Sequence, residues 1–166
     1  MRDGPGKSAG GVLCLDWRFV ADTVMGGVST GEVTIGLHRG RNAARLTGTV
    51  SLDNQGGFIQ MASNLAEEGH ALDASGSAGL AFDVLGNGER YEVSLRTTAL
   101  DRPWQSYRAA FTAVPDWRRL ELPFAAFRPH RTEVRFDPSR LRRFGILAVG
   151  RAFAVDVSVA DLGFYT

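Results

Sequence analysis

The chain has 166 residues, of which 44% are hydrophobic and 22% charged, and its formal net charge is +1 at pH 7. This composition is typical of one globular domain and argues against a disordered chain, a membrane span and a nucleic-acid-binding protein. The single cysteine, Cys14, excludes an internal disulfide. Residues 1–11 are polar and glycine-rich, and no apolar run suited to a signal peptide follows them. We therefore expect a flexible segment over 1–11, a single domain over 12–166 and a cytoplasmic protein of bacterial type.

Apolar and polar residues alternate with a period of two, which predicts strands that have one buried face. In chain order the clearest alternating segments are 44–52, 80–84, 90–97, 107–111 and 153–159. In the first of these, Leu46, Val50 and Leu52 share the face expected to be buried. The Gly-Asn-Gly-Glu run at 86–89 predicts a tight hairpin loop. The apolar positions change phase after Val159, which predicts a bulge or bend near Ala160 and Asp161.

Helical patterns are short. Residues 65–75 are interrupted by Gly69 and are expected to form a loop. Single helical turns are expected within 123–127 and 137–144, the second with Asp137 as N-cap and Pro138 at the first helical position. About ten strands with one or two such turns predict an all-β fold, a β-sandwich or jelly roll.

Two glycine pairs lie in the segments DTVMGGVST, residues 22–30, and DNQGGFIQM, residues 53–61. The first is followed by a strand-like segment and has no lysine at the phosphate-loop position, which argues against a phosphate cradle. We interpret it as a turn, packed against the second segment, with Asp22 and Ser29 bonding its backbone. Acids near these loops also leave open an uncharacterised enzyme, and a calcium ion at a loop edge is a further alternative.

The remaining candidate residues are histidines, aromatics and arginines. His38, His70 and His130 are far apart without metal-ligand spacing, so we expect no transition-metal site and no cofactor. Trp104, which follows a proline in a loop, is the best candidate for an exposed anchor. Nine arginines lie between residues 118 and 151 against Glu121, Glu133 and Asp137. This segment could form a basic surface for an acidic protein or lipid headgroups, or could be ordinary solvated positions.

Four segments carry a resemblance to a known family: DWRFVADTVMGGVSTGEV (16–33), LTGTVSLDNQGGFIQM (46–61), GLAFDVLGNGERYEVSLRT (79–97) and YRAAFTAVPDWRRLELPFAAFRP (107–129). In order and spacing they resemble the complex I intermediate-associated protein 30 family, from about Leu15 to Tyr165. The resemblance implies a jelly roll of the galactose-binding-like type, related to carbohydrate-binding modules. It also implies a role like that of the mitochondrial member, an assembly factor for respiratory complex I that acts as a chaperone and not as an enzyme.

The resemblance marks residues without assigning any of them a catalytic role. The polar and aromatic candidates for binding a ligand or partner are Asp22, Ser29, Asn54, Arg96, Trp104 and Tyr107. The signature residues expected to be structural are Trp17, Met25, Gly26, Gly27, Gly56, Gly57, Phe58, Tyr91, Trp117, Pro123, Phe124 and Phe127.

Three functions follow as hypotheses. The first is a non-enzymatic binding or assembly module that engages a protein partner. The second is a carbohydrate-binding module that uses a sheet face with Arg96, Trp104 and Tyr107. The third is an enzyme that uses the acids near the two glycine pairs. A nucleic acid is not an expected partner, and no segment is expected to span a membrane.

Overall fold

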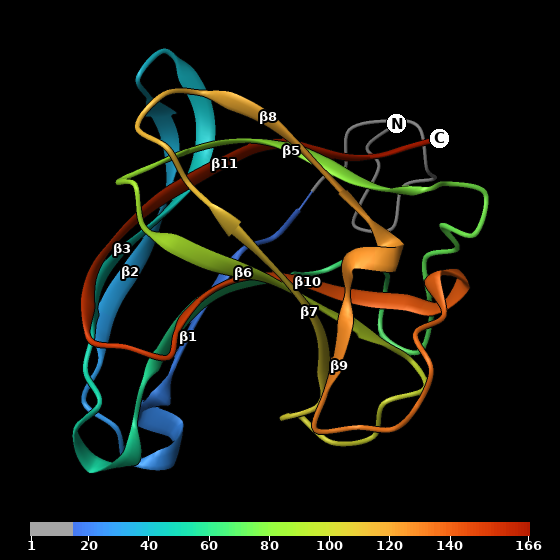
Figure 1. Ribbon diagram of the computed structural model, residues 1–166, viewed down its shortest axis with the longest axis horizontal. Coiled ribbons are helices and arrows are strands. Elements are labelled where there is room, and N and C mark those ends of the chain that lie inside the picture. The colour runs from blue at the N-terminus through green and yellow to red at the C-terminus, as the bar shows by residue number, and fades with distance from the viewer. Residues whose placement is uncertain (1–14) are drawn as a thin grey trace.

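The computed structural model of the chain describes residues 15–166, which fold into two antiparallel sheets packed face to face (Figure 1). The six-stranded sheet has the order β1-β4-β10-β6-β7-β9, and the five-stranded sheet has the order β2-β3-β11-β5-β8. The predicted all-β jelly-roll sandwich is confirmed, with eleven strands. The expected flexible segment 1–11 and Cys14 lie outside the described residues. Within residues 15–166 no helix is long and apolar enough to cross a membrane.

The strand bounds show how chain order and sheet order differ. The six-stranded sheet contains β1 (Arg18–Ala21), β4 (Phe58–Asn64), β10 (Leu141–Val149), β6 (Arg90–Thr97), β7 (Ser106–Thr112) and β9 (Arg128–His130). The five-stranded sheet contains β2 (Thr30–His38), β3 (Arg41–Val50), β11 (Phe153–Tyr165), β5 (Gly79–Gly86) and β8 (Arg118–Pro123). The last two strands of the chain are therefore internal, β10 between β4 and β6, and β11 between β3 and β5.

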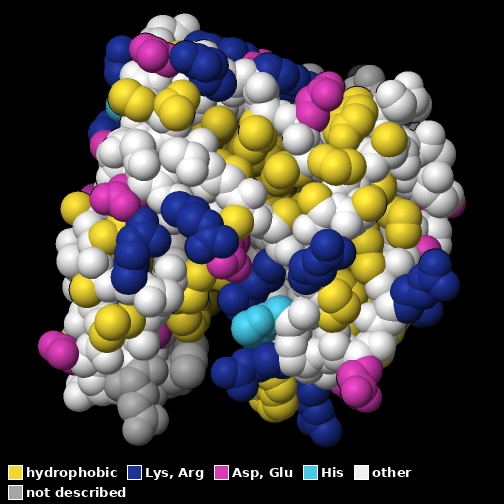
Figure 2. All heavy atoms as spheres, in the orientation of Figure 1, with side chains coloured by type: hydrophobic (Ala, Val, Ile, Leu, Met, Phe, Trp, Pro, Cys, Tyr) yellow, Lys and Arg dark blue, Asp and Glu magenta, His cyan; other side chains and the backbone are white. Residues whose placement is uncertain are grey.

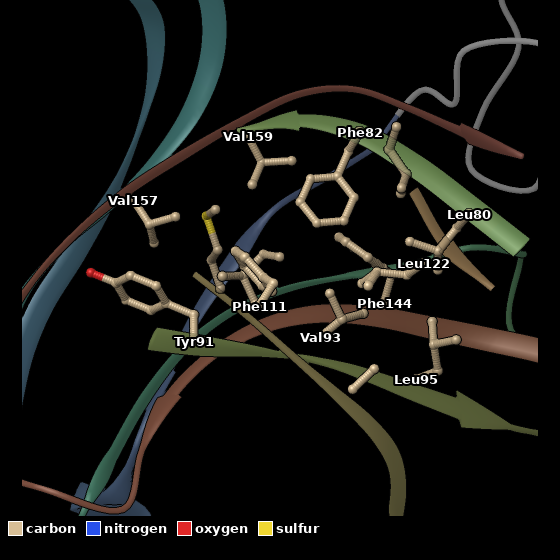
Figure 3. Close-up of a cluster of buried hydrophobic side chains, with 14 of the residues drawn as sticks. Leu80, Phe82, Tyr91, Val93, Leu95, Phe111, Leu122, Phe144, Val157 and Val159 are labelled. Carbon is tan, nitrogen blue, oxygen red and sulfur yellow. The ribbon is translucent and has the colours of Figure 1, made fainter. Parts of the chain in front are cut away.

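The core lies between the two sheets, where side chains of β5 and β11 face those of β6, β7 and β10 (Figure 3). Phe82 is fully buried and packs edge-on against Phe111 and Phe144, with ring centroids 5.6 and 6.0 Å apart. Leu46 and Val50 are buried as predicted. Leu52 is not: it is 51% exposed, because β3 ends at Val50 and the chain turns away before residue 52.

The predicted bulge in the last strand is confirmed. The register of β11 against β5 shifts between Ala160 and Gly163, and Asp161 has a φ of 53°. The shift turns both Val159 and Leu162 inward, although they are three positions apart and an unbroken strand would point them to opposite faces.

The predicted hairpin at 86–89 is wrong. Strands β5 and β6 lie in different sheets, so this short connection crosses from one sheet to the other. The Gly88 N–H donates to the Ala113 carbonyl at 2.7 Å, and Asn87 Oδ1 accepts from the Tyr91 hydroxyl at 2.7 Å. A tight turn can join two paired strands of one sheet or two strands of different sheets. Alternation of side chains within the strands does not distinguish these two connections.

Four short 3₁₀ turns connect the strands, where one or two were expected. η3 (Phe124–Ala126) and η4 (Pro138–Arg140) lie within the expected segments, and Asp137 caps η4 by accepting from the Ser139 N–H at 3.0 Å. The other two, η1 (Asp22–Met25) and η2 (Asp53–Gln55), lead into the two glycine pairs.

Replacing Phe82 by alanine tests the shared core. Removal of a ring that touches both sheets should lower the free energy of unfolding by about 4 kcal/mol, measured by urea titration. Ile35, which is 68% exposed on β2, is the control, and Ile35→Ala should change that free energy by less than about 0.5 kcal/mol. Equal effects of the two substitutions would contradict the packing described here.

Candidate functional site

The two glycine-pair loops meet at the carboxylate of Asp22, which is fully buried. Its Oδ2 accepts hydrogen bonds from the Gly57 N–H at 2.6 Å, the Phe58 N–H at 3.2 Å and the Ser29 hydroxyl at 2.5 Å. Its Oδ1 accepts from the Ser29 N–H at 3.1 Å. The Ser51 N–H in turn donates to Ser29 Oγ at 2.9 Å. One carboxylate thus ties residues 22–29 to the start of β4, as the sequence interpretation expected.

These hydrogen bonds also decide the protonation of Asp22. Burial alone would raise the pKa of the carboxyl. The donors on Ser29, Gly57 and Phe58 outweigh it, so the pKa of Asp22 lies below its ordinary value. Asp22 is therefore a buried anion at neutral pH, stabilised by N–H and O–H donors.

The glycines of both pairs are required by this arrangement in two different ways. Gly26 has a φ of 89°, in the left-handed region that favours glycine. A Cβ on Gly27 would lie 2.5 Å from Asp22 Oδ1, and a Cβ on Gly56 would lie 2.5 Å from Asp22 Oδ2. Gly26 therefore allows the left-handed turn, and Gly27 and Gly56 allow the backbone of each loop to lie close to the Asp22 carboxylate.

A groove of about 790 Å³ crosses the outer face of the six-stranded sheet, away from the core. Figure 2 shows it as a hollow at the lower edge of the molecule, with dark blue basic side chains and a cyan histidine beside it. One wall is formed by the loop that Asp22 holds, including Gly56 and Gly57, and the opposite side includes Trp104. Amide side chains of Gln60, Asn64 and Gln105 also line it.

The depth of the groove follows from small residues on neighbouring strands. Ala62 of β4 lies opposite Gly145 of β10, and Gly145 lies opposite Ser94 of β6. The adjacent row has long side chains, since Arg143 lies opposite both Asn64 and Arg96. Short residues in the centre of a sheet with longer ones beside them leave a trough on that face.

The structure brings two of the six binding candidates to this groove. Arg96 and Trp104 line it, and Trp104 is 57% exposed. Asp22 and Ser29 are buried beneath one wall, where they hold the loop. Tyr107 is fully buried and packs against Phe136, with ring centroids 4.9 Å apart. Its neighbours on β7, Ser106 and Arg108, face the groove, and alternate residues of a strand face opposite sides, so Tyr107 points to the core.

Asn54, the remaining candidate, lies in η2 on the exposed side of the second loop. Its φ of 56° is left-handed, a conformation that asparagine tolerates better than most residues. It stands next to the loop that forms the groove wall but is not part of the lining.

Five of the six basic residues that line the groove were not among the binding candidates. Arg108, His130, Arg131, Arg142 and Arg143 line it together with Arg96. Arg96, Arg108 and Arg143 occupy outward-facing positions of alternating strands, and this parity was visible in the sequence, whereas Arg142 lies at a register irregularity of β10. What was not visible was the strand order, which places β10 between β4 and β6.

The basic segment 118–151 does not form one surface. Arg131, Arg142 and Arg143 line the groove, whereas Arg118 and Arg119 lie on β8 of the other sheet. The groove also takes Arg96 and Arg108 from outside that segment. The positive region of the molecule is therefore assembled by the fold from separate strands.

The signature residues occupy mixed positions. Tyr91, Phe124 and Phe127 are buried, and Trp17 packs edge-on against Phe144. The Trp117 indole donates to the Arg39 carbonyl at 3.2 Å. Pro123 ends β8, and Phe58 begins β4 beside the groove. Met25 lies in η1. Across residues 15–166, no group of three or more His, Cys, Asp or Glu side chains is placed to hold a metal ion.

Comparison with known proteins identifies the sequence pattern. The model of the complex I intermediate-associated protein 30 family matches residues 9–157. None of the curated proteins compared with the chain is similar enough in sequence to match it.

Several solved structures with a similar fold are carbohydrate-binding modules. The family 11 module of the cellulosomal cellulase Lic26A-Cel5E of Clostridium thermocellum aligns with a TM-score of 0.73 and 14% identity, covering 98% of this chain and 96% of that one. A family 11 module from the same organism, in complex with a β-1,3-1,4-mixed-linked tetrasaccharide, has a TM-score of 0.70 and 14% identity, covering 90% and 88%. The family 30 module of cellulase Cel9D-Cel44B of Clostridium thermocellum has a TM-score of 0.60 and 18% identity, covering 98% and 92%. At these identities the likeness shows the fold alone.

Replacing Asp22 by alanine should destabilise the domain by about 3 kcal/mol, because buried N–H donors at Ser29, Gly57 and Phe58 lose their acceptor. Urea unfolding measures the loss. The control is Asp53→Ala in the neighbouring loop, where the side chain is exposed and a change below about 0.5 kcal/mol is expected. A loss no larger than that of the control would show that the carboxylate does not hold the loops.

The same carboxylate should make stability depend on pH in a defined direction. The pKa of Asp22 is lowered in the folded state, so its stabilising contribution is complete above the unfolded pKa, about 3.9. The contribution is lost as pH falls through the lower folded pKa. The difference in unfolding free energy between the wild type and Asp22→Asn should therefore stay constant from about pH 5 to 8 and shrink below about pH 4. A difference that grows on acidification would contradict the assigned charge.

Proposed function

This chain belongs to the complex I intermediate-associated protein 30 family, and on that premise we propose that it is a non-enzymatic binding module of the assembly-factor kind. Its partner is a protein, and the contact is made by the groove on the six-stranded sheet. The family's description concerns association with assembly intermediates of a protein complex, which supports a protein partner for this member.

The observation that carries the proposal is the groove itself. It is lined from β4, β6, β7 and β10, so its shape is set by a rigid sheet, and its wall is fixed by the buried Asp22 carboxylate. Trp104 presents a large exposed ring at this groove. Tryptophan and arginine are the residue types that most often dominate the energy of protein interfaces.

A second candidate is a carbohydrate ligand. Trp104 favours it, because an exposed aromatic ring offers an apolar face on which a sugar ring can stack. A module of similar fold was solved in complex with a β-1,3-1,4-mixed-linked tetrasaccharide, which makes that sugar the natural probe.

Trp104→Ala should abolish or sharply weaken partner binding. The chain is used as bait in an extract of its own source cells, captured proteins are identified by mass spectrometry, and each is purified for calorimetric titration. We expect one protein to bind the wild type and to lose about 30-fold in affinity with the variant, as for a central tryptophan at an interface. Leu37→Ala, at a 77% exposed apolar position on β2 of the other sheet, is the matched control and should bind like the wild type.

Equal binding by the wild type and Trp104→Ala would show that the partner does not contact the groove. Recovery of no protein that binds the purified chain would overturn the protein partner. Binding of the mixed-linked tetrasaccharide that Trp104→Ala abolishes would favour the second candidate, and turnover of that sugar would contradict a non-enzymatic role.

A further inference from the structure

The basic residues of the groove are not balanced by acids in its lining. Five arginines and a histidine converge there from β6, β7, β9, β10 and the loop after β9, and among the described lining residues none is an aspartate or glutamate. The basic lining residues are Arg96, Arg108, His130, Arg131, Arg142 and Arg143. In a chain whose net charge is +1, this concentration is local.

Several arginines elsewhere on the molecule are paired with carboxylates. Arg45 bonds Asp156 at 2.8 and 2.9 Å, Arg151 bonds Glu89 at 2.6 Å, and Arg41 contacts Asp83 at 2.6 Å. Arg119 contacts Asp83 as well, at 3.5 Å. Five arginines outside the groove thus have an acidic partner, whereas others, such as Arg39 and Arg128, donate to backbone carbonyls.

The groove arginines bond mainly to neutral groups instead. Arg96 donates from Nε to the Gln105 carbonyl at 3.0 Å and from Nη2 to the Arg102 carbonyl at 2.8 Å. Arg143 donates to Asn64 Oδ1 at 3.2 Å. The exception is Arg108, whose Nη1 lies 3.7 Å from Glu92 Oε1. These contacts orient the guanidinium groups and leave most of their charge uncompensated.

Two of the groove arginines occupy directly opposed positions in the sheet. Arg143 of β10 is the register partner of Arg96 on β6, and like charges in directly opposed positions destabilise a sheet. Burial, followed by the charges of Arg142 and Arg143, lowers the pKa of Arg96. Burial and the charge of Arg142 likewise lower the pKa of Arg143. An anion bound between them would relieve this repulsion.

We propose that the groove binds a short, extended, acidic segment of a protein partner, with carboxylates on Arg96 and Arg143. This inference rests on the protein-binding function proposed above and adds the chemistry of the segment that is bound. Carboxylates match the planar fork of a guanidinium, which donates two parallel hydrogen bonds to them.

The rest of the lining fits a peptide. Gln60, Gln105 and Ser94 each carry donors and acceptors that match the N–H and C=O groups of an extended chain. Phe58 and Leu147 offer apolar contacts for the side chains between the acids. Guanidinium groups only donate, so a carboxylate with two acceptor oxygens matches each of them better than a sugar hydroxyl does. A volume of about 790 Å³ is within the range of small-ligand sites, so a few residues fit and a folded surface does not.

The test uses the full chain and fluorescein-labelled peptides of about eight residues in which Glu and Ser alternate, so that the acids of an extended peptide lie on one side. Peptides with Gln or Lys in place of Glu are the charge controls. Fluorescence anisotropy should show the Glu peptide bound at least tenfold more tightly than the Gln peptide, with affinity that falls as salt rises. Arg96→Gln and Arg143→Gln should each weaken it about tenfold, and Arg143→Lys should weaken it less.

Arg118→Gln is the matched control, because it makes the same charge change at an exposed position of β8 on the other sheet, and it should leave peptide affinity unchanged. Thermal melting verifies that the variants fold, and Arg143→Gln should melt no lower than the wild type, since it removes a like-charge pair. A second arm titrates oligogalacturonate, and a third titrates a single-stranded oligonucleotide.

The proposal is overturned if the Glu and Gln peptides bind alike, if Arg96→Gln and Arg143→Gln bind like Arg118→Gln, or if either other polyanion binds more tightly than the Glu peptide. These outcomes are separate from those of the protein-binding function. A partner that loses affinity with Trp104→Ala while the Glu peptide fails would leave that function standing and remove only the acidic segment.

Discussion

The Asp22 carboxylate is the constraint on which the arrangement around the groove depends. It is buried, it is ionised, and it collects donors from both glycine-pair loops, so the end of β1, the approach to β2 and the start of β4 are fixed relative to one another. The close approach of its oxygens explains why Gly27 and Gly56 carry no side chain. A segment that looks like a ligand-binding loop in the sequence thus binds a side chain of its own protein. Its contribution to function is indirect, since it positions one wall of the groove.

The groove differs from the rest of the surface in how charge is distributed. Outside it, five arginines have a carboxylate partner, as Arg45 has in Asp156. On the six-stranded sheet, Arg96 and Arg143 occupy opposed positions and donate to carbonyl and amide oxygens. Small residues in the adjacent row, such as Gly145 and Ser94, leave the groove beside them. The carbohydrate-binding modules compared with this chain share its fold.

Alternation of apolar and polar side chains correctly predicted the sandwich, most strands and the bulge near Asp161. A strand with one buried face shows this alternation in its own residues, so the sequence of the strand is sufficient to predict it. The corner at 86–89 was wrongly predicted as a hairpin, because sheet membership depends on distant strands. Most of the groove could not be predicted for the same reason, because its lining also depends on which strands are neighbours. Arg96 and Trp104 were named from the sequence, but their juxtaposition with Arg143 requires β10 beside β6, a pairing between segments about 50 residues apart in the chain. Tyr107 was named as a binding candidate and is buried instead. It lies between two groove-lining residues of β7, and successive side chains of a strand point to opposite faces, so its ring is in the core.

The internal placement of β10 and β11 has a consequence for synthesis of the protein. Both sheets depend on late strands: β4 and β6 have no strand between them until residues 141–149 have left the ribosome, and β3 and β5 have none until residues 153–165 have done so. Until then, apolar strand edges of the nascent chain are unpaired, which exposes them to association with other chains. Loss of β11 would remove the central strand of the five-stranded sheet and leave β3 and β5 without their common partner.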